Sequence, residues 1–231
     1  LTQDEVVEGL KEALRVGTDT ATTRLMKTDG YYKNPDPLVF IPWPQEAQQA
    51  KMFYEDYGNY ISDLTGGQLL STDDIIERFN RAAEDAATDA APIFFNAITD
   101  ISISDGLGIL QGADTAATHY LRVNTFNELR ELYTPTVRNS MEKIQVQQVW
   151  QTMASNYNQA VNIINNTPFA STIYPDAIVG LSPVNDDISE YVVTEALDGL
   201  FIEVGKREGE IRNNAVARVT DILERVFGQN N

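Results

Sequence analysis

The sequence predicts an all-α protein, a single domain of about eight or nine helices over residues 1–231. Apolar residues recur at helical spacing through most of the chain, and capping residues precede several of these stretches. Alternation of the kind seen in strands is confined to short stretches near PLVFIP and TIYPDAIVG. Because 42% of the residues are apolar and 22% are charged, the composition is that of a globular chain with a sizeable core.

Helix signals follow one another through the first hundred residues. Thr2 and Glu5 form a capping box ahead of the first helical pattern. A second helix is expected over 46–64, where apolar residues share one side. Ser71 then caps a long helix with a stripe of small residues, and Pro92 ends or kinks it.

Further helix starts are expected in the second half of the chain. Thr125 and Thr134 each precede a helical pattern, and Pro135 would occupy the first helical position after Thr134. The stretch GADTAATHY, residues 112–120, is interpreted as a tight joint between two helices. We expect Asp114 to cap the second of them by accepting a backbone N–H.

An extended proline-rich arm is predicted over residues 29–45. Its four prolines oppose helix formation and favour extended backbone. An arm that carries so many aromatic side chains should lie against the helical body or against a partner subunit. The candidate partner contacts are Tyr31, Tyr32, Phe40 and Trp43.

A long packed loop is predicted over residues 162–186, where Asn, Thr, Pro, Ser and Gly are frequent. The loop still contains several large apolar side chains, and we expect these side chains to pack onto the protein. They are Phe169, Ile173, Tyr174, Ile178, Val179 and Leu181.

Charge and composition exclude several classes of function. Acidic residues number 34 against 17 basic ones, for a net charge of −17, and no basic run marks a nucleic-acid or anionic-membrane surface. The absence of cysteine excludes disulfides, thiolate nucleophiles and cysteine-bound metals. No apolar stretch approaches the roughly 20 residues that span a bilayer. We expect no metal and no cofactor.

The single histidine, His119, has no catalytic partner in the sequence. The chain contains neither a nucleophile elbow of the G-x-S-x-G type nor the H-E-x-x-H spacing of zinc proteases. We therefore interpret His119 as structural or exposed to solvent, and we predict no catalytic residue.

Several polar residues form a candidate pocket or polar network. Asn80 and Glu84 share one helix face, where they would either tie two helices together or line a pocket. Asp198 lies among apolar neighbours and should need a cationic partner, either Arg81 or Arg122. The full candidate set is Asn80, Arg81, Glu84, Asp114, Thr118, Tyr120 and Asp198.

Blocks at 80–98, 112–122, 195–212 and 225–228, with further matches at 9–22 and 34–44, resemble a known family. Together they cover almost the whole chain in one order, and the chain is similar to the bacterial domain-of-unknown-function family 4197. The resemblance implies an exported protein of Gram-negative bacteria, many of whose relatives have lipoprotein-like leaders. The family pattern has a basic residue in place of Phe40 and a shorter loop at 162–184, so a partner contacting either segment would differ.

These observations favour an exported, non-enzymatic helical protein that binds a macromolecular partner or assembles with itself. One alternative is a small-molecule or lipid-binding module with a pocket between helices. A weaker alternative is a hydrolase that uses Glu84, Asp114 or His119. The expected location is periplasmic, outer-membrane-associated or extracellular, with membrane attachment only through a lipid anchor on a leader that has been removed.

Overall fold

The computed structural model describes residues 1–66, 71–174 and 178–228. Within these ranges the chain forms ten α-helices, eight of them seven or more residues long, and no strand; it is 75% helical. The all-α prediction is therefore confirmed. In chain order the helices are α1 (Gln3–Leu25), α2 (Gln48–Thr65), α3 (Thr72–Ala87), α4 (Ala90–Asp100), α5 (Gly106–Leu110), α6 (Ala116–Lys143), α7 (Val146–Asn166), α8 (Ala170–Ile173), α9 (Ser189–Asn213) and α10 (Asp221–Phe227), with short 3-10 helices η1 (Gln45–Ala47) and η3 (Ala215–Ala217).

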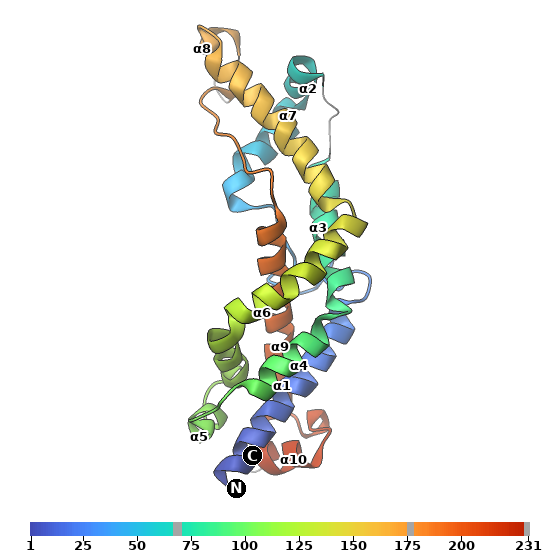
Figure 1. Cartoon of the computed structure of the whole chain (residues 1–231), viewed down its shortest axis with the longest axis vertical. Coiled ribbons are helices and arrows are strands. Elements are labelled where there is room, and N and C mark those ends of the chain that lie inside the picture. The colour runs from blue at the N-terminus through green and yellow to red at the C-terminus, as the bar shows by residue number, and fades with distance from the viewer. Residues whose placement is uncertain (67–70, 175–177, 229–231) are drawn as a thin grey trace.

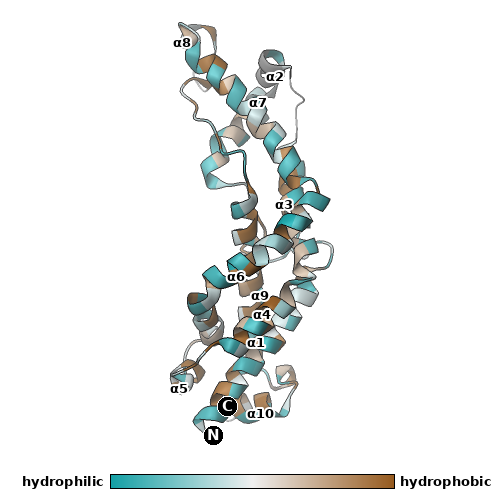
Figure 2. Ribbon diagram, viewed as in Figure 1, coloured by the Kyte–Doolittle hydropathy of each residue, from teal (hydrophilic) through white to brown (hydrophobic). Residues whose placement is uncertain are grey.

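The helices assemble into an elongated molecule (Figure 1). α1 packs along α9, and α4, α6 and α10 pack around this pair. α2 and α7 pack against each other and extend to one end of the molecule, where α8 is the outermost element. Both chain termini lie at the opposite end. Hydrophilic and hydrophobic residues alternate around the helices (Figure 2), as expected where each helix buries one face.

Close approach between α1 and its neighbours depends on small residues. A Cβ atom at Gly17 would lie 3.2 Å from a methyl group of Val204 on α9, and one at Gly9 would lie 2.5 Å from Val226 on α10. The rest of the buried face of α1 is mostly apolar, with Leu10 among its residues, and also includes Thr18 and Thr22. The helical spacing of these residues therefore both forms α1 and sets how tightly it packs.

α6 is one continuous helix, so the helix starts predicted at Thr125 and Thr134 are wrong. The Thr125 hydroxyl donates to the carbonyl of Leu121 at 2.6 Å, and the Thr134 hydroxyl donates to that of Arg130 at 2.7 Å. Both threonines thus bond within the helix instead of capping a new one. Pro135 lies inside α6, where its missing N–H removes one helix hydrogen bond, but the buried stripe continues past it.

The segment between α1 and η1 contains no helix or strand over residues 26–44. Turns and bends occupy most of it, so the chain folds back onto the helices where an extended arm was expected. Tyr31 and Trp43 are buried there, while Tyr32 and Phe40 are half-buried with ring centroids 6.3 Å apart. The aromatic side chains therefore pack on the protein's own body.

Tyr31 anchors this segment to α9. Its hydroxyl donates to the carbonyl of Ala196 at 2.6 Å, and its ring lies against Gly199. Burial raises the pKa of Tyr31 well above its ordinary value, so the hydroxyl keeps its proton and remains a donor.

The segment that precedes α9 is held by polar side chains of α7. The side-chain amide of Asn158 both donates to and accepts from the backbone of Val184, at 2.9 and 2.8 Å. The indole N–H of Trp150 donates to the carbonyl of Asn185 at 2.9 Å. These bonds satisfy backbone groups that a loop would otherwise leave to water.

The predicted loop over 162–186 is partly helical, since α7 continues to Asn166 and α8 follows it. Ile178 and Leu181 pack into the core as expected. Phe169 and Ile173 do not, because Phe169 precedes α8 and Ile173 ends it at the far end of the molecule, where they are 83% and 60% exposed. The expectation that all large apolar side chains of this segment pack down is therefore wrong for these two. Residues 175–177 of this segment lie outside the described residues.

A substitution at Gly199 tests the contact between Tyr31 and α9. In Gly199→Ala the new Cβ would lie 2.5 Å from a ring carbon of Tyr31, and we expect a loss of about 1–3 kcal/mol because the ring must move. Gly209→Ala is the matched control on the same helix, since its Cβ would meet Asp114 at an ordinary 3.6 Å. The control should gain up to about 1 kcal/mol from helix propensity. Urea unfolding measures both, and equal stability of the two variants would contradict the prediction.

Candidate functional site

Asn80 and Glu84 on α3 hold the segment between α1 and η1. The Asn80 amide accepts from the N–H of Ile41 and donates to its carbonyl, both at 2.8 Å. One Glu84 carboxylate oxygen accepts from the N–H groups of Tyr31 and Tyr32, both at 3.1 Å. Both side chains are buried. Their shared helix face therefore serves a polar network that anchors backbone.

Arg81 completes this network. It donates to the second carboxylate oxygen of Glu84 and to Asp29, each at 2.8 Å, and its guanidinium lies 4.9 Å from the ring centre of Tyr32. The hydrogen bond from Arg81 lowers the pKa of Asp29. With both of its oxygens engaged, Glu84 has little capacity left for acid–base chemistry.

The N-terminus of α6 is capped by Glu208, which reaches it from α9. Its fully buried carboxylate accepts from the N–H groups of Ala117 and Thr118, at 3.0 and 2.7 Å, and from the Thr118 hydroxyl at 2.7 Å. The expected cap, Asp114, is exposed, and α6 begins at Ala116 without a local side-chain cap. A carboxylate at this position satisfies free N–H groups and complements the helix dipole.

Arg212 pairs with Glu208 one turn further along α9. Its guanidinium lies 2.7 Å from the Glu208 carboxylate and also donates to the carbonyls of Leu110 and Ile109, at 2.7 and 3.1 Å. These carbonyls belong to the last turn of α5. One buried ion pair on α9 therefore caps the C-terminus of α5 and the N-terminus of α6.

Asp198 pairs with Arg122, one of the two partners predicted from the sequence. Their charged atoms lie 2.7 Å apart, and the guanidinium of Arg122 also lies over the rings of Phe126 and Phe201, at 4.7 and 5.5 Å. Both side chains are about one-third exposed, so Asp198 is less buried than the sequence indicates.

His119 is exposed on the rim of a shallow hollow between α6 and α9, with a volume of about 390 Å³. Lys206, on the same rim, contacts Glu203 and lies 2.9 Å from Asp36. Although burial opposes it, hydrogen bonds to these two carboxylates raise the pKa of Lys206. The cationic groups of the hollow are thus already paired within the protein.

The seven candidate residues do not form one site. Glu84 lies beside Tyr31, which packs at Gly199, whereas Asp114 packs at Gly209. Ten residues of helix separate these two levels by roughly 15 Å. The hydroxyl of Tyr120 instead donates to the carbonyl of Ser102, in the segment that follows α4. Across the described ranges, no cluster of three His, Asp or Glu side chains could hold a metal ion.

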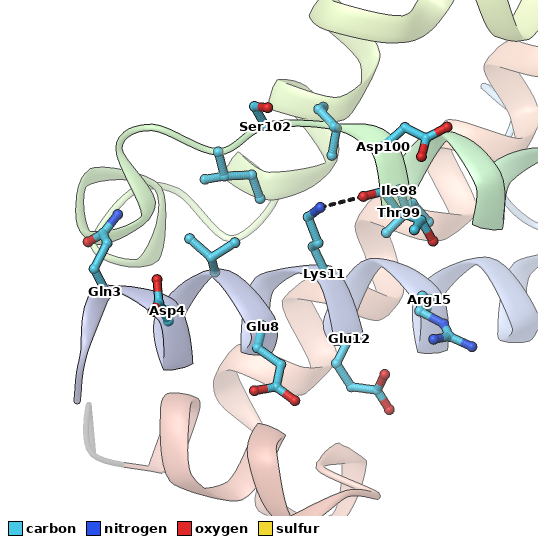
Figure 3. Close-up of a pocket in the computed structure, with 13 residues that line it drawn as sticks. Gln3, Asp4, Glu8, Lys11, Glu12, Arg15, Ile98, Thr99, Asp100 and Ser102 are labelled. Atoms are coloured by element: carbon cyan, nitrogen blue, oxygen red, sulfur yellow. Dashed lines mark hydrogen bonds between the residues drawn. The ribbon is translucent and has the colours of Figure 1, made fainter.

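A groove of about 780 Å³ lies between α1 and the segment that follows α4 (Figure 3). Val7, which is half-buried, contributes apolar surface to it, and the largely buried Ile101 and Ile103 add a little more. Lys11 reaches across from α1 and donates to the carbonyl of Thr99 at 2.7 Å, as the dashed line marks. This bond fastens the end of α4 to α1 and so fixes the separation of the groove walls.

The charged side chains around the groove are mostly acidic. Lys11 and Arg15 are the basic residues of its lining, and both lie on α1. Four carboxylates outnumber them, so the groove has a net negative charge in a protein that is itself acidic. They are Asp4, Glu8, Glu12 and Asp100.

The wall formed by residues 101–104 offers open backbone. Ile101 is in the extended conformation, and Ile101 and Ile103 point inward while Ser102 and Ser104 are exposed, which is the alternation of a strand. The Ser102 carbonyl accepts from Tyr120 at 2.8 Å. The N–H groups of Ser102, Ile103 and Ser104 have no partner within the described part of the chain. This segment was not among the sites predicted from the sequence, although the alternation of Ile and Ser over 101–104 is visible there.

Over the residues that the structure describes, the fold and its surface define an all-helical protein with a buried ion pair and an open, acidic groove. The chain belongs to the family described as "Protein of unknown function (DUF4197)", which it matches over residues 1–228. This confirms the family resemblance of its sequence blocks. No curated protein and no solved structure gives a match. Among the helices of the described residues, none has the length and apolarity needed to cross a membrane.

Removing Glu208 tests the cap shared between helices. Glu208→Ala would leave Arg212 buried without its partner, and we expect a loss of about 3–5 kcal/mol in the free energy of unfolding. The amides of Ala117 and Thr118 should also exchange hydrogen faster. Glu224→Ala, at an exposed position of α10, is the control and should change stability by less than about 0.5 kcal/mol. A similar result for both variants would show that the buried carboxylate is dispensable.

Asn80→Ala tests how the aromatic segment is held. The substitution leaves the N–H and the carbonyl of Ile41 unsatisfied, and we expect a loss of about 2 kcal/mol or more. Acrylamide should then quench the fluorescence of nearby Trp43 more strongly. Asn96→Ala, at an exposed position of α4, should leave both stability and quenching unchanged; unchanged quenching in Asn80→Ala would argue against the anchoring role.

Proposed function

We propose that this protein is a non-enzymatic binding protein whose acidic groove takes an extended segment of a partner protein. The carrying observation is the open backbone of Ser102, Ile103 and Ser104 beside the groove. An extended peptide laid along these residues would pair with their N–H groups, as in strand addition to an open edge. No second strand of the described chain occupies that position.

The charge of the groove indicates a cationic partner segment. The lining carries four carboxylates and two cations, and the whole chain has a net charge of −17. Lysine or arginine side chains of a bound peptide would be attracted to the acidic rim, and this attraction would weaken as salt is added. A partner segment rich in acidic residues would be repelled.

The apolar part of the groove supplies the remaining contacts. Alternate side chains of an extended peptide point to the same side, so every second residue would face Val7. Because the bond from Lys11 to the Thr99 carbonyl already holds the groove walls, little ordering would be needed on binding. The expected peptide therefore alternates apolar residues with basic or polar ones.

Two further parts of the proposal concern location and assembly. The family resemblance favours an exported protein, and fractionation of cells expressing the complete gene product would test this. Self-assembly is the competing form of macromolecular binding. Native mass spectrometry of protein isolated from its source distinguishes a multimer of this chain from a monomer that retains a different polypeptide.

Selection from a library of random displayed peptides tests the groove directly. We expect enrichment of peptides that alternate apolar and basic residues, with binding that weakens as salt rises. Val7→Arg places a cation in the groove and should weaken binding about tenfold or more, which corresponds to about 1.4 kcal/mol. Val123→Arg, at an exposed position of α6, is the matched control and should bind normally.

Hydrogen exchange of the same complex locates the peptide. Binding should slow exchange at the amides of Ser102, Ile103 and Ser104. A library that yields no binder, binders insensitive to Val7→Arg, or protection elsewhere would each contradict the proposal.

A further inference from the structure

The end of the molecule formed by α7 and α8 carries two exposed apolar side chains. Phe169 is 83% exposed and Ile173 is 60% exposed. Phe169 immediately precedes α8 and Ile173 is its last residue, so the two lie at opposite ends of this single turn. α8 is at the extremity of the elongated fold, away from both termini (Figure 1). We call Phe169 and Ile173 the apolar tip.

The backbone at the tip is unfavourable for the residue it carries. Phe169 has φ 59° and ψ 35°, the left-handed conformation that suits glycine or asparagine and is uncommon for an aromatic residue. Such a conformation is usually maintained by packing of the side chain, but the ring of Phe169 is largely in solvent. In the free protein, the unfavourable backbone conformation of Phe169 is therefore not offset by burial of its ring.

The helices that carry the apolar tip contain no charged residues, unlike the rest of the protein. The sequence has no charged residue from Ile144 to Pro175, a stretch that includes all of α7 and α8, although the chain as a whole has a net charge of −17. The polar residues next to the tip in α7, in α8 and between them are uncharged, as at Asn166, Thr167 and Thr172, and the first charged residue after Ile173 is Asp176, which lies outside the described residues. On the neighbouring helix α2, the charged residue nearest the C-terminal end is Asp63.

From these observations we propose that the apolar tip inserts into the surface of a lipid bilayer with zwitterionic headgroups. The surfaces of α7 and α8, which carry hydroxyl and amide groups and no charged residue, can approach such headgroups without desolvating an ion of their own. The apolar side chains then enter the boundary between headgroups and acyl chains. The acidic remainder of the molecule would be repelled by an anionic membrane, so neutral lipid is the favoured surface.

This inference is independent of the groove, since the groove lies along the first turns of α1 at the opposite end of the molecule. A variant that loses one activity should therefore keep the other. Binding of both ligands at once is also sterically allowed by their separation.

Sedimentation with vesicles of phosphatidylcholine alone measures the proposed contact. The wild-type protein should bind at high lipid concentration, and Phe169→Ser with Ile173→Ser should weaken binding about tenfold for each side chain removed. The matched control replaces Val216 and Val219, which are 87% and 61% exposed near the other end, with serine and should bind as the wild type does. Addition of phosphatidylglycerol should weaken binding.

The variant Phe169→Gly separates the effect of Phe169 on stability from its effect on vesicle binding. Glycine accepts a positive φ, so the variant should be more stable than the wild type to urea while binding vesicles about tenfold less well. A merely structural role for Phe169 would instead make the variant less stable. Phe169→Trp should show a blue shift in emission when vesicles are added.

Several results would overturn the proposal. They are an absence of vesicle binding by the wild-type protein, equal binding by the Phe169/Ile173 double variant, and stronger binding to anionic vesicles. A blue shift of Phe169→Trp that needs no lipid and rises with protein concentration would show that a second copy of the chain covers the tip.

Discussion

The buried carboxylate of Glu208 is the interaction on which the arrangement of α5, α6 and α9 depends. A carboxylate removed from water must be fully paired, and here its partners are the first turn of α6 and the guanidinium of Arg212. Arg212 in turn engages the last turn of α5. Because two helix ends meet one ion pair on α9, neither α5 nor α6 can shift along α9 without exposing a charge. The hollow that carries His119 on its rim lies between α6 and α9, so its shape depends on this arrangement.

Much of the fold follows from local signals in the sequence. The capping box at Thr2 and the cap at Ser71 are both present, because such caps depend only on residues three positions apart. The helix starts expected at Thr125 and Thr134 failed for a related reason. A threonine hydroxyl can bond to the next backbone N–H groups or to the carbonyl four residues before it, and the buried stripe of α6 decides between these. A threonine alone therefore does not determine whether a helix starts at it or continues through it, and tertiary packing decides.

The candidate site was less predictable, since its parts come together only in three dimensions. Pairing of Asp198 with a cation could be expected from the cost of burying a charge, and Arg122 supplies it. Because Asn80 and Glu84 share one helix face, the sequence allowed two interpretations, a polar network or a pocket wall, and the structure has them in a network that anchors backbone. The role of Glu208 could not be anticipated, because its backbone partners lie about ninety residues away. The groove likewise needs residues from α1 and from the end of α4.

The packing of α1 against α9 and α10 has a consequence for how the protein is made. α1 packs against α4 and α5 but also against α9 and α10, and Glu5 pairs with Arg225, which lies 220 residues later in the sequence. Contacts of such separation form late, because a long loop must close first. At about 5–20 residues per second of synthesis, α1 waits on the order of ten seconds for α9 to leave the ribosome. The part of α1 that packs on α9 and α10 therefore stays uncovered until those helices have been made, which leaves it open to chaperones throughout that interval.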